Sequence, residues 1–162
     1  MSHSAELAGK AVLITGAAGC IGAWVVKQLC ELGATPVVFD IAENRERLHL
    51  IMPDAESVTW ALGDITDFER LLEVAETHNI EAIIHLAALQ VPFCKADPVG
   101  STRINVMGSI HMLELARQRG ITRMSYASSV AAPAMGDNDW LATLYGAHKI
   151  CGEQMAAVYW QD

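Results

Sequence analysis

Residues 11–40 decide the fold and read AVLITGAAGCIGAWVVKQLCELGATPVVFD. A short apolar run comes first and is followed by three glycines at three-residue spacing, Gly16, Gly19 and Gly22. An amphipathic segment comes next, and a second apolar run ends at Asp40. This order predicts a strand, a tight turn, a helix that begins within the glycines, and a second strand parallel to the first.

The glycine turn has the spacing of a loop that binds a pyrophosphate. The first glycine lets the chain turn sharply, the second lets the backbone approach the phosphates, and the third lets the helix pack close to the strand. The helix N-terminus then presents free N–H groups and a partial positive charge to the anion. A tight turn in a packed domain would use glycines too, so the acidic residue that follows matters.

Asp40 ends the second predicted strand, 18 residues after Gly22. A carboxylate at this place accepts hydrogen bonds from both hydroxyls of an adenosine ribose and repels a 2′-phosphate. The sequence therefore predicts a dinucleotide site that prefers NAD to NADP. Arg45 argues the other way, because an arginine near this strand end could pair with the 2′-phosphate.

Composition narrows the function further. The chain has 162 residues, 52% of them hydrophobic, and a net charge of −8. We expect one domain, residues 1–162, with no nucleic-acid partner, because a phosphate-binding surface is normally basic. No signal peptide precedes the first strand and no apolar run reaches the roughly 18 residues of a membrane span, so no membrane partner is expected. The four cysteines show no metal-ligand spacing, which predicts no metal site and a cytoplasmic location.

Strand-like and helix-like segments alternate along the whole chain. The predicted strands are 11–15, 36–40, 57–64, 81–87 and 123–129. The predicted helices are 20–32, 43–51, 67–77, 98–119 and about 138–159. Because the strands are apolar almost throughout, they suit a sheet that is buried on both faces. The fold class is therefore α/β, a Rossmann-type doubly wound parallel sheet with helices on both faces, with ligand loops at 88–97 and 130–138.

Local signals mark some helix ends. Thr66 and Glu69 have the spacing of a capping box at the start of the third helix. Gly33 and Gly120 follow the first and fourth helices, where a left-handed residue is favoured. Pro98 stands near the start of the fourth helix, where its missing N–H costs little.

Four polar side chains near the C-terminal end could carry chemistry. Ser128 and Ser129 follow the fifth predicted strand, and Tyr145 and Lys149 lie four residues apart, on one face of a helix. A tyrosine hydroxyl is a poor base at neutral pH, but a neighbouring ammonium favours its phenolate. A serine hydroxyl could then hold a substrate oxygen in line for proton transfer while hydride moves to or from a nicotinamide.

Together these residues resemble the extended short-chain dehydrogenase/reductase family, the NAD-dependent epimerases and dehydratases, from Lys10 onward. The resemblance rests on Thr15-Gly16-x-x-Gly19-x-x-Gly22, on GDITD (63–67), on HLAA (85–88) and on INVMGSIHMLELAR (104–117). It implies Ser129, with Ser128 as the alternative, as the substrate-orienting hydroxyl, Tyr145 as the acid/base, and Lys149 as the residue that binds ribose and tunes the tyrosine. The cofactor-binding residues that it implies are Gly16, Gly19, Cys20, Ile21, Gly22, Asp40, Asp64, Ile65, Leu86, Ala87, Ala88, Asn105, Tyr145 and Lys149.

The resemblance also implies a reaction. Tyr145 would assist the oxidation of a hydroxyl on a sugar, nucleotide-sugar or sugar-acid substrate, a step that epimerases, dehydratases and dehydrogenases share. Family members usually continue for more than a hundred residues past Tyr-x-x-x-Lys with a substrate-binding part, which is apparently absent here. The alternative is therefore a non-catalytic or truncated dinucleotide-binding module. The family also makes a homodimer through its last two helices an expectation.

Other polar residues are interpreted as structural. His85 is expected in the core, hydrogen-bonded to backbone, and Trp60 is also expected there. Asp137 and Asp139 could be catalytic carboxylates, although acids also favour a helix N-terminus. The remaining singled-out histidines are expected on the surface: His49, His78, His111 and His148.

Overall fold

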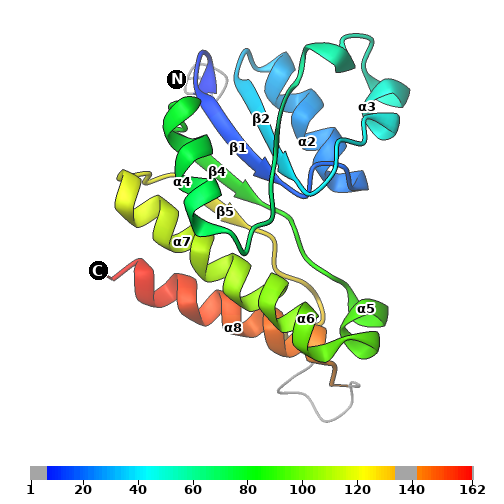
Figure 1. Ribbon diagram of the computed structural model, residues 1–162, viewed down its shortest axis with the longest axis vertical. Helices are drawn as coiled ribbons and strands as arrows, with labels where there is room; N and C mark the ends of the chain where they lie inside the picture. The colour runs from blue at the N-terminus through cyan, green and yellow to red at the C-terminus, as the bar shows by residue number, and fades with distance from the viewer. Residues whose placement is uncertain (1–6, 134–141, 162) are drawn as a thin grey trace.

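A computed structural model describes residues 7–133 and 142–161. Its centre is one five-stranded sheet in the order β3-β2-β1-β4-β5, and every neighbouring pair is parallel (Figure 1). The strands are β1 Ala11–Thr15, β2 Thr35–Asp40, β3 Thr59–Leu62, β4 Ala82–His85 and β5 Met124–Tyr126. The predicted Rossmann-type parallel sheet is confirmed.

Helices cover both faces of the sheet, as expected for right-handed βαβ connections. One face carries α2 Cys20–Glu31 and α3 Glu46–Ile51, and the other carries α4 Phe68–Thr77, α7 Gly108–Arg119 and α8 Leu144–Tyr159 (Figure 1). Between β4 and α7 the chain forms α5 Val91–Ala96, α6 Pro98–Thr102 and a π-helical turn, η2 Arg103–Met107. A short 3₁₀ turn, η1 Ala55–Ser57, precedes β3.

Alternate residues of β1 feed two separate hydrophobic clusters. Leu13 packs with Val37 and Ile83 under α4 and α7, whereas Val12 and Ile14 pack under α2 and α3. All three β1 side chains are at most 1% exposed. Because side chains alternate across a strand, an all-apolar strand needs cover on both sides, and the two helical layers supply it.

The first two strands end where predicted, at Thr15 and Asp40, but the last three are shorter than predicted at their carboxyl ends. Sequence patterning extended the third, fourth and fifth strands to 64, 87 and 129, but the ladders stop at Leu62, His85 and Tyr126. Apolar and serine residues beyond these points leave the sheet and line the space above it. The prediction of irregular chain over 88–97 was wrong in part, because α5 forms there with Pro92 in its first turn.

Helix ends test the local signals. Gly33 and Gly120 have φ of 74° and 65°, so both left-handed helix ends are confirmed. The capping box at Thr66 is wrong: Asp67 is the N-cap of α4, and its Oδ1 accepts from the N–H of Arg70 at 3.0 Å.

The last predicted helix begins later than expected. Within the described residues α8 starts at Leu144, after Thr143, whose Oγ1 accepts from the N–H of Gly146. Asp137 and Asp139 lie outside the described residues. No helix in the described ranges has both the length and the apolar character needed to cross a membrane.

Candidate functional site

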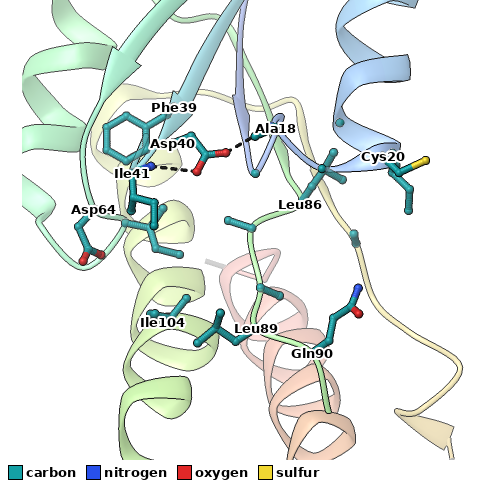
Figure 2. Close-up of a pocket in the computed structure, with 18 of the residues that line it drawn as sticks. Ala18, Cys20, Phe39, Asp40, Ile41, Asp64, Leu86, Leu89, Gln90 and Ile104 are labelled. Carbon is teal, nitrogen blue, oxygen red and sulfur yellow. Dashed lines mark hydrogen bonds between the residues drawn. The ribbon is translucent and has the colours of Figure 1, made fainter. Parts of the chain in front are cut away.

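A cavity of about 680 Å³ opens at the carboxyl ends of the strands (Figure 2). Segments far apart in the sequence line it, because the parallel sheet brings the chain after each strand to the same edge. The predicted residues found in its lining are Gly16, Gly19, Cys20, Ile21, Gly22, Asp40, Asp64, Ile65, Leu86, Ala87, Ala88, Tyr145 and Lys149, with Ser128 from the serine pair. Asn105 and Ser129 are not among the described lining residues.

Two of the glycines are required by close backbone contacts. Gly16 has φ of 71°, and a Cβ on it would stand 2.8 Å from the Cα of Ala87. A Cβ on Gly22 would meet the backbone of Ala17 and lie 2.7 Å from the carbonyl oxygen of Gly16. These contacts hold the start of α2 against β1 and β4, at the floor of the cavity.

Gly19 leaves the start of α2 open. It is the N-cap residue and offers no side-chain oxygen to the first-turn N–H groups, while a Cβ on it would meet only the Gly16 carbonyl oxygen, at 3.2 Å. A helix N-terminus without a side-chain cap, opening on a cavity, is suited to phosphate oxygens. The residues present therefore fit a dinucleotide.

Asp40 is held in place at one end of the cavity. Its Oδ1 accepts from the N–H of Ile41 at 2.9 Å, and its Oδ2 from the N–H of Ala18 at 3.4 Å (Figure 2). The carboxylate is thus tied to the glycine loop itself. This arrangement suits a ribose diol, which needs two acceptor oxygens in a fixed orientation.

Arg45, the arginine that could favour NADP over NAD, is not among the described residues that line the cavity. Arg45 donates through Nη1 to the carbonyl oxygens of Ala55 and Val58, at 2.6 and 3.0 Å, and its guanidinium lies over the Trp60 ring. Arg47, which sequence reasoning missed, lines the cavity and donates to the carbonyl oxygen of Ala18. Its place on α3, two residues further on, could not be told apart from that of Arg45 by spacing alone.

Asp64 and Ile65 form the wall beyond β3. The Oδ1 of Asp64 accepts from both the N–H and the hydroxyl of Thr66, at 2.8 Å each, which fixes the turn. Ile65 is 6% exposed and packs on Gly108 of α7, where a Cβ would collide with it. The apolar side of this wall includes Phe39.

At the other end of the cavity, Lys149 is buried beneath two tyrosine rings. Its side chain is 3% exposed, and Nζ donates to the carbonyl oxygen of Ala127 at 2.6 Å. Nζ lies 5.7 Å from the ring centroid of Tyr145 and 4.7 Å from that of Tyr126. Burial lowers the pKa of Lys149 to about 8. The spacing of four residues on α8 therefore does place the ammonium beside the Tyr145 ring.

The serines have different environments. Ser128 lines the cavity, and its hydroxyl donates to the carboxylate of Glu153 on α8. The Oγ of Ser129 accepts from the N–H of Ala131 at 3.2 Å, in the turn that follows β5. Only Ser128 of the pair therefore faces the space between the glycine loop and Tyr145 in the described structure.

His85 is a core histidine, as expected, but its partners are side chains and not backbone. Nδ1 pairs with the hydroxyl of Thr15 at 2.6 Å and Nε2 with that of Ser109 at 3.1 Å. Burial is the main cause that lowers the pKa of His85 to about 3, with the charge of Lys149 adding to it. The Thr15 oxygen also accepts from the N–H groups of Leu86 and Ala87, so this chain of bonds holds the cavity floor.

Asn105 does not line the cavity, but it hydrogen-bonds the backbone of Leu89, which does. Its Oδ1 accepts from the N–H of Leu89 at 2.7 Å, and its Nδ2 donates to the carbonyl oxygen of Leu89 at 2.8 Å. Leu89 and its neighbour Gln90 line the cavity, although the sequence had only indicated a loop there (Figure 2). Asn105 therefore positions the lining and does not itself face the cavity.

The surface assignment of His148 is wrong. This side chain is 4% exposed and lies among Asn105, Thr102 and Cys94. Sequence reasoning missed it because residue 148 precedes Lys149 on α8, and the only signal was its three-residue spacing from Tyr145. His111 is also engaged, with Nδ1 at 2.9 Å from the carbonyl oxygen of Ile65.

Comparison with known proteins agrees with this geometry. The model of the NAD dependent epimerase/dehydratase family matches residues 12–162. The chain belongs to this family. It is 38% identical over 126 residues to a UDP-glucose 4-epimerase of Rhizobium leguminosarum bv. trifolii, an alignment that covers 77% of this chain and 37% of that one. The chain thus spans 37% of the length of this relative and of a UDP-glucose 4-epimerase of Mus musculus.

Solved structures of the family have the same fold. An L-threonine dehydrogenase from Clostridium difficile superimposes with a TM-score of 0.79 at 30% identity, over 96% of this chain and 50% of that one. A UDP-glucose 4-epimerase from Thermus thermophilus, solved in complex with NAD, gives 0.79 at 28% identity, over 93% and 51%. The family is NAD-dependent, and the similar structures named here are a dehydrogenase and an epimerase.

Proposed function

We propose that the chain binds NAD in this cavity and takes part in hydride transfer from the carbon that bears a substrate hydroxyl, with NADP disfavoured. The observation that supports this most is that one cavity joins the uncapped start of α2, the oriented Asp40 carboxylate and the Tyr145–Lys149 pair. The glycine loop and the first turn of α2 would hold the pyrophosphate, and Asp40 the adenosine ribose. Asp64 and Ile65 would border the adenine, and Leu86, Ala87 and Ala88 the nicotinamide ribose.

The chemistry of this chain's own residues follows from their placement. When bound, NAD⁺ supplies the hydride acceptor. Tyr145 removes the proton of the substrate hydroxyl, because the nearby Lys149 ammonium favours a phenolate. We place the orienting hydroxyl on the serine pair, where Ser128 faces the cavity and Ser129 occupies the position that the family resemblance favours.

For the substrate, we propose a nucleotide sugar, with epimerisation as the whole protein's reaction. Support comes from the curated relatives named UDP-glucose 4-epimerase, one of which is 38% identical to this chain. The threonine dehydrogenase likeness supports a second candidate, simple dehydrogenation of a hydroxyl on a smaller substrate. A non-catalytic dinucleotide-binding module is the third outcome that the experiments below must separate.

Cofactor binding is tested by calorimetric titration of the purified chain with NAD⁺ and NADP⁺, beside Asp40→Ala. A matched control is Asp54→Ala, since Asp54 is exposed and its side chain makes no cap bond to η1. We expect NAD⁺ binding that is lost in Asp40→Ala and retained in Asp54→Ala. Equal affinity of both variants for NAD⁺ would refute the role of Asp40.

Turnover is tested by adding UDP-glucose, and separately L-threonine, to the NAD⁺-loaded chain. The reduced cofactor is followed by its absorbance and the 4-epimer by chromatography. Loss of either signal in Tyr145→Phe with unchanged NAD⁺ affinity supports catalysis by Tyr145. NAD⁺ binding without any product would instead favour the binding module.

We also propose a cytoplasmic homodimer. The cysteines Cys20, Cys30, Cys94 and Cys151 are free thiols, as a reducing compartment favours. The helices α7 and α8 lie side by side, and the outer end of α8 exposes Val158 and Trp160, at 57% and 86% (Figure 1). Sedimentation of the wild type and of Trp160→Glu decides this, because a dimer through that end should dissociate in the variant.

A further inference from the structure

His148 sits at a junction that ties the helix of Tyr145 and Lys149 to the cavity wall. It lies on α8 between those two residues, and its ring contacts α5, α6 and η2. Its Nδ1 is 3.1 Å from Nδ2 of Asn105, and its Nε2 is 3.0 Å from the hydroxyl oxygen of Thr102. At 4% exposed, the ring has no role yet in binding or catalysis.

The partners determine which nitrogen carries the proton. The hydroxyl of Thr102 donates its single hydrogen to the carbonyl oxygen of Pro98 at 2.7 Å, so its oxygen must accept from Nε2–H of His148. Nδ1 is then unprotonated and accepts from the Asn105 amide, whose orientation is set by Leu89. The neutral Nε2–H form therefore satisfies every bond, whereas a protonated ring would point Nδ1–H at the Asn105 amide hydrogens.

The next link in this network is the lining of the cavity. Asn105 clamps Leu89 through both its backbone N–H and its carbonyl oxygen, and the thiol of Cys94 donates to the same carbonyl at 3.1 Å. Leu89 and Gln90 line the same cavity as Tyr145. We propose that His148, in its neutral form, is a positioning residue that locks α8 to the Asn105–Leu89 clamp and so holds Tyr145 and Lys149 in register with the cavity wall. This inference rests on the proposed function.

Acidification should break the hydrogen bond between His148 and Asn105, because only the neutral Nε2–H ring can accept from the Asn105 amide. Within the described part of the chain, the titratable group in contact with the ring is the thiol of Cys94, whose Sγ is 3.9 Å from Nδ1. The charged side chains of the packed elements have other surroundings. Lys95 and Arg103 are exposed, and Lys149 donates to the Ala127 carbonyl oxygen. Among the carboxylates, Asp97 accepts from the N–H of Gly100, Glu114 binds Arg117, and Glu153 accepts from the hydroxyl of Ser128. Among the described residues no carboxylate is paired with the ring, and burial lowers the pKa of His148.

Two substitutions separate the two bonds of the ring. The shorter amide of His148→Asn can place its oxygen near the position of Nδ1, so it keeps an acceptor for Asn105 and cannot titrate. The longer amide of His148→Gln reaches toward Thr102 and leaves the Asn105 amide without that acceptor. His78→Asn is the control, because His78 is the residue that follows α4 and is not among the contacts of the His148 ring given above.

The first measurement is nitrogen NMR of the His148 ring together with hydrogen exchange at the Leu89 amide, between pH 7.5 and 5.0. We expect the Nε2–H form at pH 7.5, and Leu89 exchange that accelerates beyond the chemical trend as the ring is protonated. In His148→Gln this exchange should be fast at both pH values, and in His148→Asn slow at both. The proposal is overturned if the proton is found on Nδ1 at pH 7.5, or if the exchange rate of the Leu89 amide does not depend on the protonation state of the His148 ring.

The second measurement is NAD⁺ affinity over the same range. Wild type and His78→Asn should weaken about three- to tenfold on acidification, the factor for one buried hydrogen bond, while His148→Asn should not. His148→Gln should be weaker by a similar factor at both pH values. The inference is overturned if His148→Asn loses NAD⁺ affinity on acidification as the wild type does, or if His148→Gln binds NAD⁺ as tightly as the wild type. Either result would leave the proposed function intact. If wild type binds NAD⁺ at neither pH, the proposed function fails, and the exchange measurement alone decides the lock.

Discussion

Replacing Lys149 with methionine should make the chain more stable and less able to bind its cofactor. The ammonium is 3% exposed, and burial lowers its pKa from 10.5 to about 8. That lowering corresponds to about 3 kcal/mol at neutral pH, and solvent in the open cavity screens part of it, which leaves about 2 kcal/mol. Methionine fills a similar volume without a charge, but it leaves the Ala127 carbonyl without its donor, a loss of about 1 kcal/mol.

We therefore expect Lys149→Met to raise the free energy of unfolding by about 1 kcal/mol at pH 7, with weaker NAD⁺ binding. The sign of the pH dependence follows from the depressed pKa. Above pH 8 the folded chain loses the Lys149 proton while the unfolded chain keeps it up to about 10.5, so the wild type gains stability. The advantage of the variant should shrink by about 1.4 kcal/mol per pH unit over this window and reverse before pH 9.5.

The assay is urea unfolding of both chains at pH 7.0, 8.0, 8.75 and 9.5, followed by tryptophan fluorescence. Lys27→Met, which removes a half-buried lysine on α2 that pairs with Glu31, is the control and should show a constant difference from wild type. A Lys149→Met variant that is less stable than wild type at pH 7 would refute the reasoning. So would a stability difference between the two chains that does not change with pH.

Three further predictions concern the scaffold. Gly22→Ala should lower the free energy of unfolding by more than about 2 kcal/mol and abolish NAD⁺ binding, because the added Cβ meets the backbone of Ala17 and Gly16. Gly33→Ala should lower it by only about 1 kcal/mol, since only its positive φ is strained. Urea midpoints measure both stabilities and calorimetry measures NAD⁺ binding. Asp67→Ala should cost about 1 kcal/mol and Glu69→Ala less than about 0.5, because Asp67 caps α4; the reverse order of unfolding midpoints would restore the capping box. The His85 ring should stay neutral down to pH 4 in NMR titrations, because its pKa is about 3. Since the unfolded chain protonates this histidine below pH 6.5 and the folded chain does not, the protein should lose about 1.4 kcal/mol of stability per pH unit as the pH falls from 6.5 toward 3. Protonation of the ring near pH 6 would contradict its burial.

Local sequence patterns carried most of the fold. The apolar runs that became β1 and β2 could be buried only between two layers of helices, and the glycines before α2 allowed one close turn. These are properties of short segments, so they can be read without knowing their neighbours. Asp40, Tyr145 and Lys149 all line the cavity, and they could be singled out in the sequence because a strand end and a four-residue helical spacing are also local; their roles stay predictions.

Contacts between distant segments were not readable in this way. Whether Arg45 or Arg47 faces the cavity depends on how α3 docks, and the first reaches backbone carbonyls before β3 while the second reaches the glycine loop. Ser128 and Ser129 are neighbours in a segment that leaves the sheet, so only the course of the chain after Tyr126 decides which hydroxyl faces the cavity.

The sequence by itself determined a parallel α/β sheet with a glycine-rich turn, an acidic strand end and a Tyr-x-x-x-Lys helix face, because each is specified by residues close together in the chain. The tertiary structure alone decided the burial of His148, the Asn105–Leu89 clamp and the pairing of His85 with Thr15 and Ser109. The physical reason is that a buried polar side chain is stabilised by partners that can come from anywhere in the sequence. Only the packing of α5, α6, η2 and α8 together supplies those of His148.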